Sequence, residues 1–270
     1  MQFKRDKTQN SNKIILDKYY TDKELANDLI KKTYEIVGKD NITEVIEPSA
    51  GNGAFSSQIE GCIAYDIEPE GENIKKQDFL KLNLPYKKGR LFIGNPPFGD
   101  RNRLSVRFFK HCITMGDYIA FILPISQLNN NQQMYEFDLV YSEDLGKVYF
   151  TDRYIRVCFN IYKRPEGRLN NKPKNTSKHI TIYEIRNQNK PIPKNYDLCI
   201  CAWGSIGKPY DPSEKRYTKE FFIKIDNHSQ KNNIIDLLKN TDWCKTFPMT
   251  STPNLLQWQV FKIVNDHFGL

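Results

Sequence analysis

The chain has 270 residues, of which 39% are hydrophobic and 27% charged, a composition typical of a folded globular protein rather than a disordered one. No run of about 18 apolar residues is present, so we expect no membrane span. The polar segment Met1–Lys13 lacks the apolar core of a secretory signal, so we expect a cytoplasmic protein.

The net charge of +8 is unevenly distributed along the chain. Residues 1–150 hold 20 Lys and Arg against 21 Asp and Glu, whereas residues 151–270 hold 20 against 11. The whole basic excess therefore lies in the C-terminal part, where it would attract a polyanion. A lysine-rich surface that only contacts solvent is the alternative interpretation.

The six cysteines include no Cys-x-x-Cys pair, and the four histidines are scattered. This pattern predicts neither a metal site nor a disulfide framework, and it favours reduced thiols. Cys199 and Cys201 alternate within a predicted strand, so we assign both to packing.

The N-terminal half begins with a predicted flexible arm over residues 1–14. Thr21-x-x-Glu24 has the form of a capping box, which predicts a helix that begins at Thr21. Four continuous apolar runs then alternate with turns and helical segments: Val45–Ile46, Ile63–Tyr65, Leu91–Ile93 and Ile119–Leu123. Continuous runs are typical of strands covered on both faces, so the pattern predicts a parallel, Rossmann-like α/β sheet with helices on both faces.

The C-terminal half contributes further predicted elements on either side of a polar linker. Val148–Tyr149 and Val157–Tyr162 are predicted strands of the same sheet, and residues 166–178 form an exposed linker. Strands are predicted beyond it at Ile180–Ile185, Leu198–Trp203 and Phe221–Ile225, and helices near Ile234–Leu238 and Leu255–Phe268. We therefore predict a catalytic domain over residues 15–165 and a small basic α+β extension over residues 166–270.

Polar motifs follow each of the predicted parallel strands, where open α/β sheets bind their ligands. Residues 47–53 form a loop in which Gly51 and Gly53 permit positive φ and close approach of a ligand. Asp66 ends the next strand and could accept hydrogen bonds from ribose hydroxyls, and Asp78 with Phe79 could contact an adenine edge. Asp66 follows the glycine loop by fewer residues than in dinucleotide-binding proteins, which disfavours NAD.

The segment Asn95-Pro96-Pro97-Phe98 carries the most specific signal. The two prolines fix the backbone and remove two donors. The Asn95 side-chain oxygen and the Pro96 carbonyl can each accept one N–H of a planar amine, which favours a tetrahedral nitrogen with a localised lone pair. Phe98 could stack on the base, which must leave a duplex to reach such a pocket.

Taken in order, these motifs resemble those of amino-methyltransferases, in particular the adenine-specific (N6) DNA methyltransferases. The likeness covers roughly residues 15–165 and has the gamma order of motifs, with Tyr19-Tyr20-Thr21 similar to the family's Phe-Tyr-Thr segment and Asp22 in place of its usual proline. It implies a class I methyltransferase fold and catalytic roles for Asn95, Pro96, Pro97 and Phe98. It also implies S-adenosylmethionine contacts from Tyr20, Thr21, Glu47, Pro48, Ser49, Ala50, Gly51, Gly53, Asp66, Ile67, Asp78, Phe79 and Asn95.

The resemblance implies direct in-line methylation of adenine N6 in a flipped-out DNA base, with no metal. It also implies a bacterial, phage or viral context, in which such enzymes act in restriction-modification beside a cognate restriction enzyme, or without one. We expect Arg101, Arg103 and Lys208 to contact the nucleic acid. RNA adenine is the alternative substrate, a catalytically inactive nucleic-acid-binding subunit is a second alternative, and the basic C-terminal part argues against a protein glutamine substrate.

Overall fold

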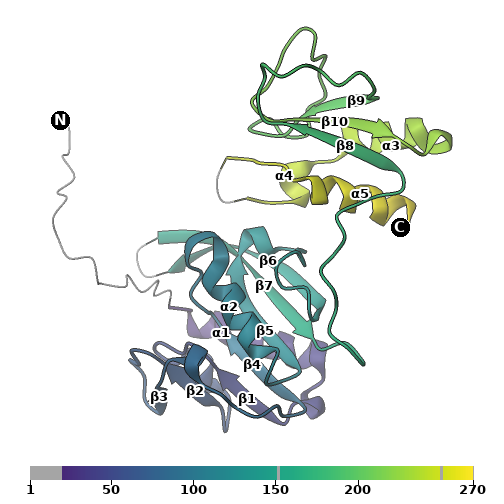
Figure 1. Cartoon of the computed structure of the whole chain (residues 1–270). Coiled ribbons are helices and arrows are strands. Elements are labelled where there is room, and N and C mark those ends of the chain that lie inside the picture. The colour runs from purple at the N-terminus through teal and green to yellow at the C-terminus, as the bar shows by residue number, and fades with distance from the viewer. Residues whose placement is uncertain (1–19, 151–152, 250–251, 270) are drawn as a thin grey trace, which may run out of the picture.

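The structure is a computed structural model that describes residues 20–150, 153–249 and 252–269. Within those residues the chain forms a larger lobe on a seven-stranded sheet and a smaller lobe on a three-stranded sheet (Figure 1). The predicted arm at residues 1–14 lies outside the described residues.

The larger sheet has the strand order β3-β2-β1-β4-β5-β7-β6. Its strands are β1 (Glu44–Glu47), β2 (Ile63–Asp66), β3 (Ile74–Lys76), β4 (Arg90–Gly94), β5 (Tyr118–Pro124), β6 (Asp138–Phe150) and β7 (Arg153–Lys163). The first five strands are parallel, and β7 pairs antiparallel with both β5 and β6. This is the mostly parallel, Rossmann-like α/β sheet that the sequence predicts.

One long helix covers each face of this sheet, α1 (Lys23–Val37) on one side and α2 (Arg103–Cys112) on the other (Figure 1). Neighbouring residues of a strand point to opposite faces. Leu91 and Ile93 pack in the cluster that contains α1, whereas Phe92 packs in the cluster that contains α2. All three side chains are fully buried, which is why the strand reads as a continuous apolar run.

The first helix begins two residues later than the sequence predicts. Its N-cap is Asp22, whose carboxylate accepts from the backbone N–H groups of Glu24 (2.8 Å) and Leu25 (3.2 Å). The capping box predicted at Thr21 is therefore wrong. The Thr21 hydroxyl accepts instead from the Asn95 side-chain amide, and Thr21 is buried.

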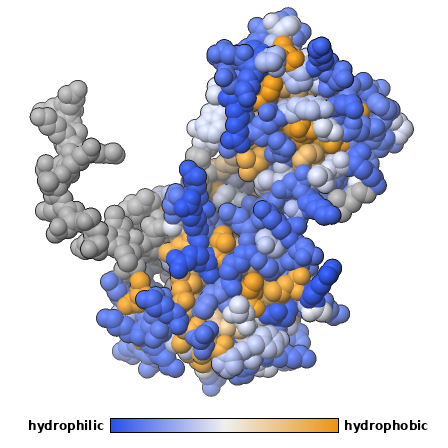
Figure 2. Space-filling model, in the orientation of Figure 1, coloured by the Kyte–Doolittle hydropathy of each residue, from blue (hydrophilic) through white to orange (hydrophobic). Residues whose placement is uncertain are grey.

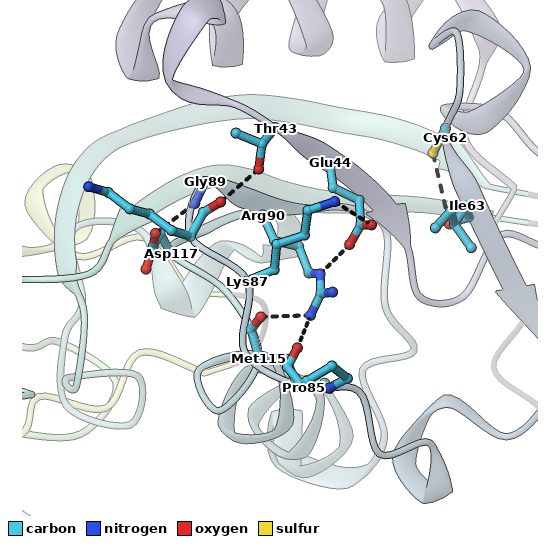
Figure 3. A network of polar contacts seen from close by, with 11 residues as sticks. Thr43, Glu44, Cys62, Ile63, Pro85, Lys87, Gly89, Arg90, Met115 and Asp117 are labelled. Carbon is cyan, nitrogen blue, oxygen red and sulfur yellow. Dashed lines mark hydrogen bonds and ion pairs between the residues drawn. The ribbon is translucent and has the colours of Figure 1, made fainter.

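The amino edge of the sheet is held by a polar network (Figure 3). Arg90, which is 4% exposed, pairs with Glu44 and donates to the carbonyl oxygens of Pro85 (2.7 Å) and Met115 (2.8 Å). Asp117 accepts from the backbone N–H of Gly89 at 2.8 Å. These bonds tie together the starts of β1, β4 and β5, at the edge opposite to the predicted motifs.

The smaller lobe has an antiparallel sheet in the order β8-β10-β9, with helices over one face. Its elements are β8 (Ile180–Ile185), β9 (Leu198–Cys201), β10 (Glu220–Ile225), α3 (Lys231–Asn240), α4 (Trp243–Thr246) and α5 (Gln257–Phe268). Short 3-10 helices complete the described residues: η1 (Lys39–Asn41), η2 (Ser56–Gln58), η3 (Phe79–Lys81), η4 (Asp100–Asn102), η5 (Ile125–Gln127) and η6 (His228–Gln230). Cys199 and Cys201 are buried and free, as the packing assignment predicts.

The linker between the lobes, residues 164–179, is attached to both of them. Asn170 donates its backbone N–H to the Glu136 carbonyl (3.0 Å) and its side-chain amide to Asp138 (2.7 Å) in the larger lobe. Near the other end, the Thr176 carbonyl accepts from Asn265 of α5 at 2.9 Å.

Hydrophilic residues cover most of the visible surface of both lobes, and apolar residues gather in smaller patches (Figure 2). None of the helices in the described part of the chain combines the length and the apolar content that crossing a bilayer requires.

Candidate functional site

A cavity of about 380 Å³ lies at the carboxyl edge of the parallel strands, opposite the Arg90 network. Its wall comes from the segments that directly follow β1, β2, β3 and β4, together with the start of α2. Every predicted cofactor residue except Gly53 lines it: Tyr20, Thr21, Glu47, Pro48, Ser49, Ala50, Gly51, Asp66, Ile67, Asp78, Phe79 and Asn95. The parallel topology thus brings together motifs that lie up to 75 residues apart in the sequence.

The loop after β1 has the backbone conformation that its glycines predict. Gly51 and Gly53 have φ values of 53° and 79°, which other residues adopt only at a cost. The Gly53 N–H donates to the Ala50 carbonyl at 2.7 Å and closes a tight turn. The Tyr20 ring lies beside this turn, because a Cβ atom built on Gly51 would lie 3.6 Å from it.

Asp66 fixes this loop from the end of β2. One of its carboxylate oxygens accepts from the Gly51 N–H and the other from the Glu68 N–H, both at 2.8 Å. A carboxylate offers about four acceptor positions, so each oxygen keeps one for a ligand. The geometry therefore orients Asp66 and leaves it able to accept from a pair of hydroxyls.

Glu47, at the end of β1, is 2% exposed and lies beneath the glycine loop. Its carboxylate accepts from the Ser56 backbone N–H at 2.7 Å. Burial raises the pKa of this carboxyl from 4.5 to about 7, because the ionised form is poorly solvated there, and the negative Asp66 adds to the rise. Glu47 is therefore partly protonated at neutral pH.

Asp78 and Phe79 follow β3 and form one wall of the cavity. An Asp78 oxygen accepts from the Leu80 N–H at 3.1 Å, which holds the carboxylate at the start of a short helical turn. Phe79 is 1% exposed and stacks with Phe108 of α2, with 5.8 Å between ring centroids. This pair gives the cavity an apolar wall beside a carboxylate.

Asn95 follows β4 and is held from two sides. Its side-chain nitrogen donates to the Thr21 hydroxyl at 3.3 Å, which orients the amide, and its carbonyl accepts from the Ser49 hydroxyl at 3.4 Å. Pro97 also lines the cavity, and its carbonyl accepts from Ser105 of α2 at 3.1 Å. Pro96 is buried.

Phe98 lies outside the wall of this cavity. Its side chain is 7% exposed and packs in the cluster that contains α1, and Phe98 is absent from the cavity wall. Stacking on a substrate base would require the ring to leave that cluster, at the expense of its buried apolar area.

The predicted nucleic-acid contacts also lie outside the cavity. Arg101 and Arg103 are exposed at the start of α2, and Arg101 has a left-handed backbone with φ 50° and ψ 37°. Lys208 is exposed in the smaller lobe. Of the basic side chains near the motif, Arg107 lines the cavity. Sequence reasoning missed it, because its place at the cavity depends on the direction of α2.

Asn102 is a second residue that the sequence did not single out. It has a φ of 63° and is 5% exposed, and neither polar atom of its side chain has a hydrogen-bond partner in the described residues. An unpaired buried amide costs about 1–3 kcal/mol, and a positive φ at a residue other than glycine adds to the cost of this conformation.

No group of three or more His, Cys, Asp or Glu side chains in the described residues is arranged to hold a metal ion, and all six cysteines are free thiols. Burial raises the pKa of the Cys62 thiol to about 12.

Comparisons with known proteins return distant structural likenesses. No protein-family model matches the chain, and no curated protein sequence matches it. A Pyrococcus horikoshii protein described as a candidate RNA methyltransferase shares 16% identity over 57% of this chain and 90% of its own, with a TM-score of 0.45. The 23S rRNA methyltransferase ErmE shares 15% identity over 57% of this chain and 72% of its own, with a TM-score of 0.41.

A third similar structure extends over both lobes. The methyltransferase subunit of a type I restriction-modification system from Streptococcus thermophilus shares 12% identity over 94% of this chain and 58% of its own, with a TM-score of 0.40.

Proposed function

We propose that the protein transfers a methyl group from S-adenosylmethionine to the exocyclic amino group of adenine in DNA. The observation that carries this proposal is one cavity lined by the glycine loop, Asp66, Asp78 and the Asn95 side chain. Each group alone has ordinary structural explanations. Together they match the two halves of the reaction, a nucleoside-containing methyl donor and a planar amine.

The residues of the cavity fit S-adenosylmethionine. Its volume of about 380 Å³ lies within the roughly 300–1,000 Å³ of small-molecule sites. The two remaining acceptor positions of Asp66 suit the ribose hydroxyls, and the apolar wall of Phe79 and Phe108 suits the flat face of adenine. The turn at Gly51 lets the ligand approach the backbone closely.

When bound, the cofactor supplies an electrophilic methyl group on a sulfonium. The Asn95 side-chain oxygen and the Pro96 carbonyl accept the two N–H groups of the target amine and favour a tetrahedral nitrogen. With S-adenosylmethionine held by the glycine loop, Asp66 and the Phe79 wall, these acceptors would orient the lone pair of the amine toward the methyl group that the cofactor would supply, and the amine proton would leave to water. Thr21 contributes by holding the Asn95 amide in one orientation. Under this proposal, methyl transfer is accelerated because the target amine is held in position and its hydrogen-bond acceptors are already oriented.

A nucleic-acid substrate is supported by the charge distribution, since residues 151–270 carry the basic excess of the chain. DNA is preferred over RNA because the motifs resemble those of DNA adenine methyltransferases. Restriction-modification is a setting consistent with this activity. Under the proposal, the exposed Arg101, Arg103 and Lys208 contact phosphates beside the target.

The test is transfer of a labelled methyl group from S-adenosylmethionine to duplex DNA, single-stranded DNA and structured RNA, followed by mass spectrometry of the digested nucleosides. We expect N6-methyladenine in DNA for the natural protein and a loss of at least a hundredfold for Asn95→Ala. Asn232→Ala is the matched control, because this exposed asparagine lies on α3 in the other lobe.

Three outcomes would change the proposal. Methylation of RNA alone would move the substrate to RNA, and cofactor binding without transfer to any substrate would favour an inactive binding subunit. Full activity in Asn95→Ala would remove Asn95 from the catalytic role.

A further inference from the structure

The hairpin formed by β6 and β7 extends past the carboxyl edge of the sheet. β5 ends at Pro124, which pairs with Val157, whereas the hairpin continues for several more pairs, including Tyr149 with Tyr154. Gly94, the last residue of β4, aligns through Phe121 of β5 with Asn160. The extension, residues 147–150 of β6 with 153–156 of β7, therefore projects from the same edge of the sheet at which Asn95 lies.

The two faces of this extension differ in chemistry. Side chains alternate along each strand, so Val148, Phe150, Ile155 and Val157 share one face, and this face packs into the cluster that contains α1. The other face carries Lys147, Tyr149, Tyr154 and Arg156, which the register places in two directly opposed pairs. We call these four residues the hairpin patch.

The hairpin patch is exposed to an unusual degree for aromatic residues. Tyr154 is 69% exposed and Tyr149 is 55% exposed, while the adjacent Phe150 is fully buried. The two tyrosine rings lie 5.1 Å apart at an interplanar angle of 57°. Exposed aromatic groups that contact each other at the rim of a site mark a binding surface rather than a folding core.

We propose that the hairpin patch binds the nucleic acid several nucleotides away from the target nucleotide, with the tyrosines stacking on bases and the two cations facing phosphates. This inference rests on the proposed function and adds a contact surface to it. Aromatic rings beside Lys or Arg are the combination by which proteins hold unstacked nucleotides, since every base offers a flat face. Arg156 is paired with Asp144 at 2.5 Å, so Lys147 supplies the more available positive charge.

The position of the patch decides which nucleotides it reaches. In the aligned strands Tyr154 lies six residues beyond Asn160, which is about 20 Å of strand length at roughly 3.3 Å per residue. That is too far for contact with a base whose amine is at Asn95. It matches nucleotides several steps along the strand, at about 3.4 Å per step in duplex DNA.

A second copy of the chain is a less suitable occupant of this surface. A two-fold contact through the patch would bring like charges of Lys147 and Arg156 together, which is destabilising. Self-association through this face is therefore one of the outcomes that would overturn the proposal.

The experiment compares binding of a fluorescein-labelled 30-nucleotide DNA, single-stranded and duplex, to the full chain and to the double variant Tyr149→Ala/Tyr154→Ala. We expect at least a tenfold loss of affinity, full recovery in the corresponding Phe double variant, and unchanged S-adenosylmethionine binding by calorimetry. Tyr86→Ala is the matched control, because Tyr86 is 52% exposed and its hydroxyl bonds Asp117 at the opposite edge of the sheet. We also expect Lys147→Ala to reduce the salt dependence of binding by about one counterion.

The outcomes separate this inference from the proposed function. If the natural protein methylates DNA and the Tyr149→Ala/Tyr154→Ala variant binds DNA equally well, the hairpin inference is wrong and the function stands. If the alanine variant loses a dimer, seen by light scattering, the patch is a self-association surface and the inference is also wrong. If the natural protein neither binds S-adenosylmethionine nor methylates any nucleic acid, the proposed function itself fails.

Discussion

Glu47 should make the stability of the larger lobe depend on pH in an unusual direction. Its pKa is about 7 in the folded chain and near 4.5 when the chain unfolds. Between these values the folded protein holds a proton that the unfolded chain has released, so the free energy of unfolding falls as the pH rises. The contribution of Glu47 to the free energy of unfolding is fully present below about pH 4.5, and it is lost as the pH rises through about 7.

The size of this effect follows from the two pKa values. At about 1.4 kcal/mol per pH unit, the linkage amounts to about 2–3 kcal/mol between pH 5 and pH 8.5. Glu47→Gln removes the titration and can keep an oxygen that accepts from the Ser56 N–H. We therefore expect the natural protein to lose about 2–3 kcal/mol more than the variant over this interval.

The assay is urea-induced unfolding followed by far-UV circular dichroism at pH 5, 6, 7 and 8.5. Tryptophan fluorescence would be the wrong probe, because all three tryptophans lie in the smaller lobe. Glu44→Gln on the same strand is the control. The Lys87 and Arg90 side chains hold the pKa of Glu44 below its usual value despite the opposing effect of burial, so its variant should change stability equally at all four pH values. Parallel curves for the natural protein and Glu47→Gln would refute the argument.

Three further predictions concern the scaffold and the cavity. Arg90→Met should lower the free energy of unfolding by about 3 kcal/mol, because the largely buried Glu44 carboxylate loses its buried partner. Lys87→Met removes a more exposed pair with the same carboxylate, and it should cost less than about 1 kcal/mol in the same urea titration. Gly51→Ala and Gly61→Ala should each cost about 1 kcal/mol because both glycines have positive φ, but only the former should weaken S-adenosylmethionine binding, about tenfold by calorimetry. A chromogenic thiol reagent should modify the exposed Cys244 rapidly, the half-buried Cys62 more slowly and the four buried cysteines only on unfolding; more than two equivalents before unfolding would contradict the burial of those four.

The sheet and most of the cavity wall could be predicted because two simple rules act together. Continuous apolar runs mark strands covered on both faces, and parallel strands place the residues that follow them at one edge. Asp66 follows its run directly and Asn95 follows its run after one glycine, so the order of the strands is enough to predict that both lie at the cavity.

The errors arise where side-chain direction decides the outcome. Phe98 belongs to a motif of four consecutive residues, and the sequence does not show which of them turn toward the core. Thr21 and Asp22 are both good N-cap residues, and only the contact with Asn95 decides that Thr21 faces the site. Arg107 was missed because it lies nine residues after Phe98, and its distance from the motif depends on the path of α2.

The attachment of the linker has a consequence for lobe exchange. Asn170 bonds to the larger lobe and Thr176 to the smaller one, and none of the hydrogen bonds described above joins residues 171–175 to either lobe. A hybrid that joins this catalytic lobe to a different C-terminal lobe should therefore be cut between residues 171 and 175, where both sets of anchoring bonds survive. A junction placed before residue 170 would remove the Asn170 hydrogen bonds to the larger lobe. The new lobe would then be held less firmly against the catalytic lobe, and we expect methylation to be less selective among target positions.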